Sequence, residues 1–443
     1  MNKINLLTCL LLIGFCFLFN CSQHAESEKK QSDSGPIKVE LRNVNGRYFL
    51  LRDRKPFTFN GAGLEFGDME KLAQHGGTSI RTWRTDNGQE TGQQVLDRAL
   101  ANGLTVTMCL EVARERHGFD YNDTSAVQAQ FMDIKKQVLR YKDHPALIIW
   151  AIGNELNLGF TNPRVYDAVN DLSKMIHQVD PYHLTTSTTA GINKDLVDII
   201  KQRAPDLDLL SVQSYGDIVN LPKYIRETGW TKPYMVTEWG ATGHWEVDTT
   251  TWGAPIEQNS SAKARSYLDR YKVAIEPFPH QCVGSYVFLW GQKQERTPTW
   301  YGMFLKSGEE TETVDVMHYI WNHEWPENRS PGVVSMFLDG KSANDDCYLT
   351  KNSIYSAQAK VKDPDGDPLT FSWVIMEESK NLGDGGDKEA IPQQISGLIE
   401  DPTTNPISLH PPDQAGAYRL YMYAFDGQGH AAYANIPFYV RPK

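Results

Sequence analysis

Two glutamates of this sequence each follow directly on a run of apolar residues. Glu155 comes after the run 147–154, and Glu238 comes after the run 234–237. A carboxylate in such a place is costly to remove from water unless it is paired or used in chemistry. Cleavage of a glycosidic bond needs two carboxyl groups, one protonated to donate to the leaving oxygen and one ionised to attack the anomeric carbon or to activate water. Glu155 and Glu238 are therefore candidates for such a pair.

Eight short apolar or β-branched runs alternate with segments of helical periodicity between residues 57 and 330. Repeated strand and helix units of this number and length predict an α/β fold, a (β/α)8 TIM barrel. The predicted strands cover residues 57–65, 78–84, 104–111, 147–154, 184–189, 207–214, 234–239 and 284–290. Two of the predicted helices, 126–141 and 164–178, place their apolar residues on one stripe. These stripes are Phe131, Ile134, Val138 and Leu139 in the first helix, and Val165, Val169, Leu172 and Ile176 in the second.

A doubly wound open sheet is the competing architecture. It would normally carry a glycine-rich phosphate turn directly after its first strand. The corresponding segment here is Gly61-Ala62-Gly63-Leu64-Glu65-Phe66, which lacks the third glycine. The dinucleotide signal is weak, and the barrel is favoured.

In a barrel of this kind the active site lies at the carboxyl ends of the strands. Glu155 follows the fourth predicted strand and Glu238 ends the seventh. These two strands face each other across the barrel mouth, so the two carboxyl groups are expected to meet there. A separation of about 5 to 5.5 Å would predict retention of the anomeric configuration.

The two strand ends resemble the retaining glycoside hydrolases of clan A, over about residues 57–325. The resemblance rests on Asn154-Glu155 after the fourth strand and on Glu238 at the end of the seventh. It implies that Glu155 is the general acid/base and Glu238 the nucleophile, and that Asn154 holds the sugar 2-hydroxyl. The alternative is that both glutamates are salt-bridged residues of the barrel rim.

The same resemblance implies roles for three further residues. Arg81 would hydrogen-bond the nucleophile and stabilise its charge, Tyr215 would donate to Glu238, and Trp290 would stack on the sugar ring. A rim ion pair is the alternative for Arg81, and a place in the core is the alternative for Trp290. Many clan members carry a histidine two residues before the tyrosine, where this chain has Gln213.

Other residues in or next to the predicted strand-to-helix loops are candidates for sugar binding. Glu111, at the end of the third strand, would bind a hydroxyl or be an ordinary exposed carboxylate. Five tryptophans are expected either to line an extended saccharide cleft or to pack in the core: Trp83, Trp239, Trp245, Trp252 and Trp300. Of these, Trp239 is the one taken as a substrate-binding residue.

The barrel is expected to lie between two all-β parts. Residues 37–56 predict a hairpin around Asn45-Gly46 that closes the bottom of the barrel. Residues 331–443 alternate with period two between turn residues and resemble an immunoglobulin-like or PKD-type sandwich. The aspartates at 363, 365 and 367 suggest calcium, but Gly366 falls in the wrong place for an EF-hand loop. An Asp/Gly turn is favoured there, and no metal is expected.

The first 20 residues begin with a basic residue and continue with an apolar stretch, and a polar segment follows them, which is the pattern of a signal peptide. The segment ending in Cys21 resembles the lipobox of bacterial lipoproteins, although Asn20 departs from the small residue expected there. We expect lipidation at Cys21, a flexible tether over residues 21–36 and a lipid-anchored protein at the outer membrane or its periplasmic face. Plain secretion is the alternative.

The charge and the cysteine content of the sequence argue against several classes of binding partner. A net charge of -11 and a pI near 5.6 argue against nucleic acid, because phosphate binding needs a basic surface. Cys109, Cys282 and Cys347 form no CxxC pair and lack metal-ligand spacing, so neither a disulfide framework nor a zinc site is expected. We expect a monomer without a cofactor that binds a β-linked glycan.

A barrel followed by an Ig-like domain on a lipoprotein signal resembles endo-acting β-1,3-glucanases. The alternative enzymes are an exo-β-glycosidase similar to family 2, such as a β-galactosidase or β-mannosidase, and a transglycosylase. Family 2 enzymes carry a jelly roll and a sandwich before the barrel, where this chain has only the hairpin. A surface lipoprotein that binds glycans without cutting them is a further alternative, but it has no need of the pair Glu155 and Glu238.

Overall fold

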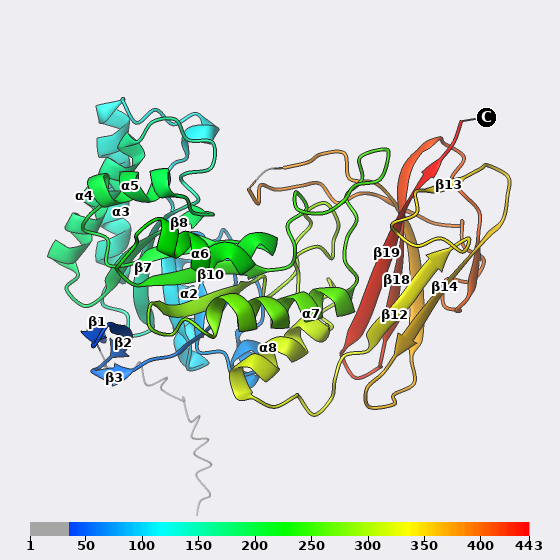
Figure 1. The fold of residues 1–443 in the computed structure, drawn as a ribbon, viewed down its shortest axis with the longest axis horizontal. Helices are drawn as coiled ribbons and strands as arrows, with labels where there is room; N and C mark the ends of the chain where they lie inside the picture. Colours follow the sequence, from blue (N-terminus) through cyan, green and yellow to red (C-terminus); the bar gives the residue numbers. More distant parts are fainter. Residues whose placement is uncertain (1–34, 384, 443) are drawn as a thin grey trace, which may run out of the picture. The chain divides into compact units, whose positions relative to one another are not determined.

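The computed structural model describes residues 35–383 and 385–442 (Figure 1). The predicted signal peptide, most of the tether and the lipidation site Cys21 lie outside these residues. Within the described ranges, no helix has the length and apolar character needed to cross a membrane.

A closed barrel of eight parallel strands forms the first large part of the fold, as the sequence predicted (Figure 1). Around the barrel the strands follow one another in chain order, and β11 closes against β4. Each predicted strand overlaps an observed one: β4 (Phe59–Gly63), β5 (Ser79–Arg81), β6 (Thr105–Leu110), β7 (Leu147–Asn154), β8 (Leu184–Ala190), β9 (Leu210–Gln213), β10 (Tyr234–Gly240) and β11 (Cys282–Phe288).

Helices connect most of the strands and cover the barrel. They are α1 (Met69–Gln74), α2 (Gly92–Ala101), α3 (Thr124–Tyr141), α4 (Arg164–Val179), α5 (Lys194–Arg203), α6 (Leu221–Glu227), α7 (Ser260–Arg270) and α8 (Glu312–Asn322), with short helical turns η1 (Glu115–His117), η2 (Gly216–Asn220) and η3 (Tyr271–Ile275). The predicted stripe of α4 is buried throughout. In α3 the stripe is wrong at Leu139, which is 46% exposed, because the buried face runs through Ile134, Val138 and Tyr141.

Two glycines of β4, the first barrel strand, have aromatic side chains packed closely against them. Gly61 and Gly63 lie in β4, where an added Cβ would approach the ring of Tyr286 to 2.4 Å and the ring of Trp83 to 2.9 Å. Tyr286 fills the barrel interior and donates or accepts hydrogen bonds with Ser79 and Thr107. The two glycines therefore leave room for aromatic side chains.

The predicted hairpin closes the bottom of the barrel. Strands β1 (Val39–Val44) and β2 (Arg47–Arg52) pair through the turn at Asn45-Gly46, and the short β3 (Lys55–Pro56) joins them. Val39 and Leu50 pack with Ile148, Leu184 and Met235, which lie at or near the amino ends of barrel strands. The opposite end of the barrel, where Glu155 and Glu238 lie, is left for the site.

The C-terminal part is all β, and its two sheets enclose a core of their own. One sheet holds β12 (Gly332–Leu338), β14 (Tyr355–Lys362) and β17 (Ile407–Leu409). The other holds β13 (Cys347–Leu349), β19 (Ala431–Val440), β18 (Gly416–Phe425), β15 (Thr370–Glu377) and β16 (Gln394–Ile395). The alternating runs of the sequence correspond to β18 and β19. Assignment of this part as an Ig-like or PKD-type module stays a prediction.

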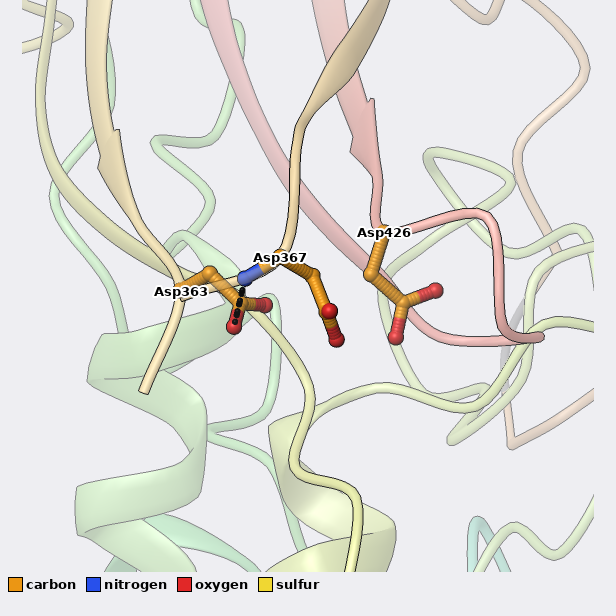
Figure 2. A group of neighbouring side chains, drawn as sticks. All are labelled: Asp363, Asp367 and Asp426. Carbon is orange, nitrogen blue, oxygen red and sulfur yellow. Dashed lines mark hydrogen bonds between the residues drawn. The ribbon is translucent and has the colours of Figure 1, made fainter. Parts of the chain in front are cut away.

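Three aspartates converge beside the C-terminal sheets (Figure 2). Asp363 Oδ1 accepts hydrogen bonds from the backbone N–H groups of Asp365, Gly366 and Asp367, which is the Asp/Gly turn that the sequence favoured. Asp426, at the end of β18, brings its carboxylate within 4.8 Å of those of Asp363 and Asp367. Asp365 lies outside this group and accepts from the backbone of Arg329.

The cysteine thiols of the described residues lie in the interior of the protein. Cys109, Cys282 and Cys347 are buried and free. Burial raises the pKa of the Cys109 thiol to about 11 and that of Cys282 to about 12. Neither thiol is a nucleophile at neutral pH.

A buried ion pair joins the barrel to the C-terminal sheets. Lys263 Nζ, on α7, lies 2.5 Å from Glu257 Oε1 and also donates to the hydroxyl of Tyr433, on β19. Glu257 Oε2 accepts from Asn435 Nδ2 at 2.6 Å. Burial alone would raise the pKa of Glu257, but the Lys263 ammonium and the hydroxyl of Thr297, which donates to Glu257, hold it below its usual value. The pair is therefore charged and fully satisfied.

Replacing Lys263 by methionine is expected to lower the free energy of unfolding by about 3 to 5 kcal/mol, because Glu257 would remain buried without a counter-charge. Urea denaturation of both proteins measures this difference. Lys223→Met is the control, because Lys223 has a side chain 60% exposed and is expected to change stability by less than about 0.5 kcal/mol. Equal effects of the two substitutions would contradict the stabilising role of the pair.

Candidate active site

Glu238, in β10, accepts hydrogen bonds from four side chains at the carboxyl end of the barrel. It is 5% exposed. Its Oε1 accepts from Trp83 Nε1 at 2.7 Å, from Gln213 Nε2 at 2.9 Å and from Arg81 Nη1. Its Oε2 accepts from the hydroxyl of Tyr215 at 2.7 Å. Both oxygens act as acceptors, which is the role of an ionised carboxylate in a fixed orientation.

Arg81 connects the carboxylate of Glu238 to Asn154, the last residue of β7. It ends β5, is fully buried, and donates from Nη2 to Asn154 Oδ1 as well as from Nη1 to Glu238. The contact between Arg81 and Glu238 expected from the resemblance is present. An arginine completely removed from water in this way stays charged and needs the partner carboxylate.

Glu155 directly follows β7 and has an unusual backbone. Its φ is +52°, and Gly153, two positions earlier, has a φ of +77°. A left-handed glutamate is strained, and such residues cluster at functional sites. The strained residue is fixed by its backbone N–H, which donates to the carbonyl of Thr188 on β8 at 3.1 Å.

The environment of Glu155 favours its protonated form. Burial raises the pKa of Glu155 to about 8, and the negative charge of Glu238 adds to this rise. The guanidinium groups of Arg81, Arg114 and Arg116 oppose it to a smaller extent. Glu155 is thus expected to be protonated at neutral pH, while the carboxylate of Glu238 accepts hydrogen bonds from four donors. A neutral carboxyl group beside an ionised one is the arrangement that an acid and nucleophile pair requires.

Both glutamates line one cavity of about 1090 Å³ at the barrel mouth. Asn154 and Tyr215, predicted as substrate-binding residues, line it too. Asn154 Oδ1 accepts hydrogen bonds from Arg81, from Gln213 Nε2 at 2.8 Å and from Thr188 Oγ1 at 3.2 Å. Its Nδ2 makes no hydrogen bond to any part of the chain that the structure describes, and it is the atom available to a sugar hydroxyl.

Two predicted tryptophan contacts are not seen. Trp239 is wrong as a substrate-binding residue, because successive side chains of a strand point to opposite faces. Glu238 points into the barrel mouth, so Trp239 points outward and packs against Tyr267 and Tyr271. Trp290 borders the cavity, but it is fully buried and its Nε1 donates to the carbonyl of Asp68. No face of its ring is exposed for stacking, so that role stays a prediction.

Glu111 and four tryptophan candidates lie in different places. Glu111 is exposed and lines a neighbouring cavity of about 310 Å³ together with Arg114, not the cavity of Glu155 and Glu238. Trp83 and Trp245 line the main cavity, as the sequence allowed. Trp252 packs instead against Tyr348 and Tyr439, and Trp300 is buried.

Sequence reasoning missed two parts of the site. Gln213 bridges Asn154 and Glu238, although the sequence marked it only as a departure from the clan pattern. The second part is a segment from the C-terminal sheets, residues 378–383 and 385–391 between β15 and β16, which we call the cover loop (orange in Figure 1). Residues of the cover loop from Gly385 to Ile391 line the cavity. No local pattern in that segment points to the barrel.

Ion pairs hold the cover loop to the barrel rim. Asp387 Oδ2 lies 3.0 Å from Arg116 Nη1, and Lys293 Nζ donates to the carbonyl of Gly386 at 2.7 Å. Glu389, which is 4% exposed, pairs with Arg296. The cover loop is therefore a fixed wall on one side of the cavity.

Comparisons with known proteins agree with this barrel. Residues 85–253 match the glycosyl hydrolases family 2 TIM barrel domain. A β-galactosidase of Oenococcus oeni is 22% identical over 223 residues, which is 46% of this chain and 20% of that protein. The chain thus spans a fifth of the length of this curated relative.

Solved structures show the same fold. A β-D-glucuronidase of Dictyoglomus thermophilum superposes with a TM-score of 0.50 at 16% identity, over 65% of this chain and 54% of the other. Bacteroides uniformis β-glucuronidase 2, covalently bound to cyclophellitol-6-carboxylate aziridine, superposes with a TM-score of 0.50 at 13% identity, over 91% of this chain and 48% of the other. These likenesses concern the fold.

Proposed function

We propose that this chain is a retaining β-glycosidase of the family 2 type that removes a terminal sugar. The observation that carries the proposal is the constellation around Glu238, where Arg81, Trp83, Gln213 and Tyr215 all donate to its carboxylate in the cavity that Glu155 also lines. The match to family 2 supports a β-glycosidase. An endo-β-1,3-glucanase, the first expectation from the sequence, finds no support among the relatives, and the exo-acting alternative fits better.

The shape of the cavity supports action at a chain end. An endo-acting enzyme needs an open cleft through which a polymer can pass in both directions. Here the cover loop, anchored by Asp387 and Glu389, walls one side of the cavity that holds both glutamates. A terminal sugar enters such a cavity more readily than an internal one.

The proposed reaction proceeds in two displacements. In the first, Glu238 attacks the anomeric carbon while Glu155 gives its proton to the leaving oxygen, so the glycosidic bond breaks and a glycosyl–Glu238 ester forms. In the second, ionised Glu155 takes a proton from water, whose oxygen attacks the anomeric carbon and releases Glu238. Asn154 Nδ2 is placed to donate to a sugar hydroxyl, and Tyr215 and Trp83 keep the attacking carboxylate oriented.

Hydrolysis of a substrate panel tests the proposal. We expect the purified protein to cleave a β-galactoside or a β-glucuronide, the sugars that the relatives' names suggest, faster than laminarin or a β-mannan. Activity should be lost in Glu155→Gln and Glu238→Gln and kept in Glu324→Gln, which changes an exposed glutamate outside the cavity. Glycan binding without products, unaffected by the first two substitutions, would favour the non-catalytic alternative.

The activity is expected to fall as the pH rises through about 8, because Glu155 must be protonated for the first displacement and its pKa is raised to about 8. The measurement is kcat/KM for a methyl glycoside as a function of pH. In Glu155→Gln this alkaline limb should be absent from the residual activity. A limb that persists in Glu155→Gln would assign the titration to another group.

A further inference from the structure

Exposed apolar side chains gather at the mouth of the catalytic cavity. Phe66 is 57% exposed, Trp245 59% and Ile391 56%, which places them among the most exposed large hydrophobic residues of the described chain. All three line the cavity that holds Glu155 and Glu238. Apolar surface kept in water beside a concave site marks a place where a ligand contacts it.

Three separate segments bring these side chains together. Phe66 follows β4, Trp245 follows β10, and Ile391 belongs to the cover loop. The ring of Trp245 packs edge-on against Tyr215, with centroids 5.6 Å apart, and the cover loop is fixed by the buried Glu389 and Arg296 pair. The apolar group is therefore positioned by the fold.

The direction of the substrate follows from the chemistry. The sugar under attack must place its anomeric carbon against Glu238, which is 5% exposed at the inner end of the cavity. The leaving group on that carbon must then extend away from Glu238 and toward solvent. It consequently passes the side chains at the mouth, which are Phe66, Trp245 and Ile391.

Two pairs of charged side chains around the outer cavity already bind one another. Arg84 Nε lies 2.9 Å from Glu65 Oε1, and Lys293 Nζ lies 2.7 Å from Glu295 Oε2. A hydroxyl-rich leaving group would have to compete for these partners, which costs most of what the new hydrogen bonds gain. An apolar leaving group needs none of them and removes the exposed apolar surface from water.

We propose that Phe66, Trp245 and Ile391 form a subsite for an apolar aglycone, so that the chain prefers β-glycosides of apolar alcohols to oligosaccharides. This inference rests on the proposed function, because it names the leaving group of the same reaction. It adds that a residue of the C-terminal part, Ile391, determines substrate choice.

Hexyl and methyl glycosides of one sugar test the subsite, as galactosides and as glucuronides. Both leaving groups are simple alkoxides of similar basicity, so the ratio of their kcat/KM values reports contacts with the alkyl chain. For the unchanged protein we expect the hexyl glycoside to be favoured by at least about tenfold, and also to exceed the corresponding disaccharide. A ratio near one, or a preference for the disaccharide, overturns the proposal.

Substitutions at the mouth of the cavity test which residues produce the preference for the hexyl glycoside. Ile391→Ser and Phe66→Ala are each expected to lower the hexyl-to-methyl ratio, by about tenfold or to near one. Ile354→Ser is the matched control, since Ile354 is 62% exposed in the same C-terminal part but does not line the cavity. A ratio that falls equally in Ile354→Ser, or that falls in neither cavity variant, contradicts a subsite at these residues.

A binding measurement separates this inference from the proposed function. Hexyl and methyl 1-thio-β-glycosides resist cleavage, so calorimetry with Glu238→Gln measures their affinities without turnover. Tighter binding of the hexyl compound supports the subsite even if no glycoside is hydrolysed, in which case only the proposed function fails. Equal affinities, including no measurable binding of either compound, overturn the subsite itself.

Discussion

Replacing Glu238 by glutamine is expected to lower kcat by about 10⁴-fold or more, the scale seen when a catalytic nucleophile is removed. The amide cannot form the glycosyl ester, and it places an N–H group opposite the donors of Arg81, Trp83 and Tyr215. Steady-state hydrolysis of a 4-nitrophenyl glycoside measures the loss.

Rescue by azide distinguishes a lost nucleophile from a damaged site. In Glu238→Ala, azide can enter the vacated space, form a bond to the anomeric carbon and release nitrophenolate. The glycosyl azide should then have a configuration opposite to that of the substrate. Recovery without inversion, or activity of Glu238→Gln near that of the unchanged protein, would remove Glu238 from the role of nucleophile.

Replacing Glu155 by glutamine is expected to have an effect that depends on the leaving group. For a methyl glycoside, kcat/KM should fall by about 10²- to 10⁴-fold, because the leaving oxygen needs the proton that Glu155 supplies. For a 4-nitrophenyl glycoside the first displacement should be much less affected, since nitrophenolate leaves without a proton. The second displacement still needs Glu155 as a base, so the glycosyl–enzyme should accumulate.

A burst of nitrophenolate in Glu155→Gln, equal to the amount of enzyme, is the readout of that accumulation. Glu324→Gln, at an exposed position outside the cavity, should behave as the unchanged protein does. Equal losses on the methyl and 4-nitrophenyl substrates would show that Glu155 does not act through protonation of the leaving group.

The barrel and its two glutamates were predictable because their signals are local. Apolar runs of strand length recur at regular spacing, and each of the two glutamates directly follows such a run, which ends at Asn154 or at Thr237. The contacts of Arg81 and Tyr215 with Glu238 followed from their places at strand ends together with the resemblance. The error at Trp239 has a local cause as well, since the alternation of side chains in β10 assigns it to the face opposite Glu238.

The cover loop could not be predicted, because its partners are remote in sequence. Asp387 pairs with Arg116, 271 positions earlier, and Glu389 pairs with Arg296, 93 positions earlier. The sequence around a charged residue does not indicate which distant residue it pairs with. The double role of Gln213 was hidden for a similar reason, because a glutamine in a strand becomes a bridge only when Asn154 and Glu238 are brought beside it.

The origin of the cover loop in the C-terminal sheets bears on how such enzymes diverge. Insertions and deletions between β15 and β16 change the wall of the cavity, because Gly385 to Ile391 line it, while Glu155 and Glu238 stay on their strands. Exchange of the C-terminal part for another one would therefore also change the wall of the cavity. A descendant that acquired a different sandwich would inherit the same chemistry with a different range of acceptable glycosides.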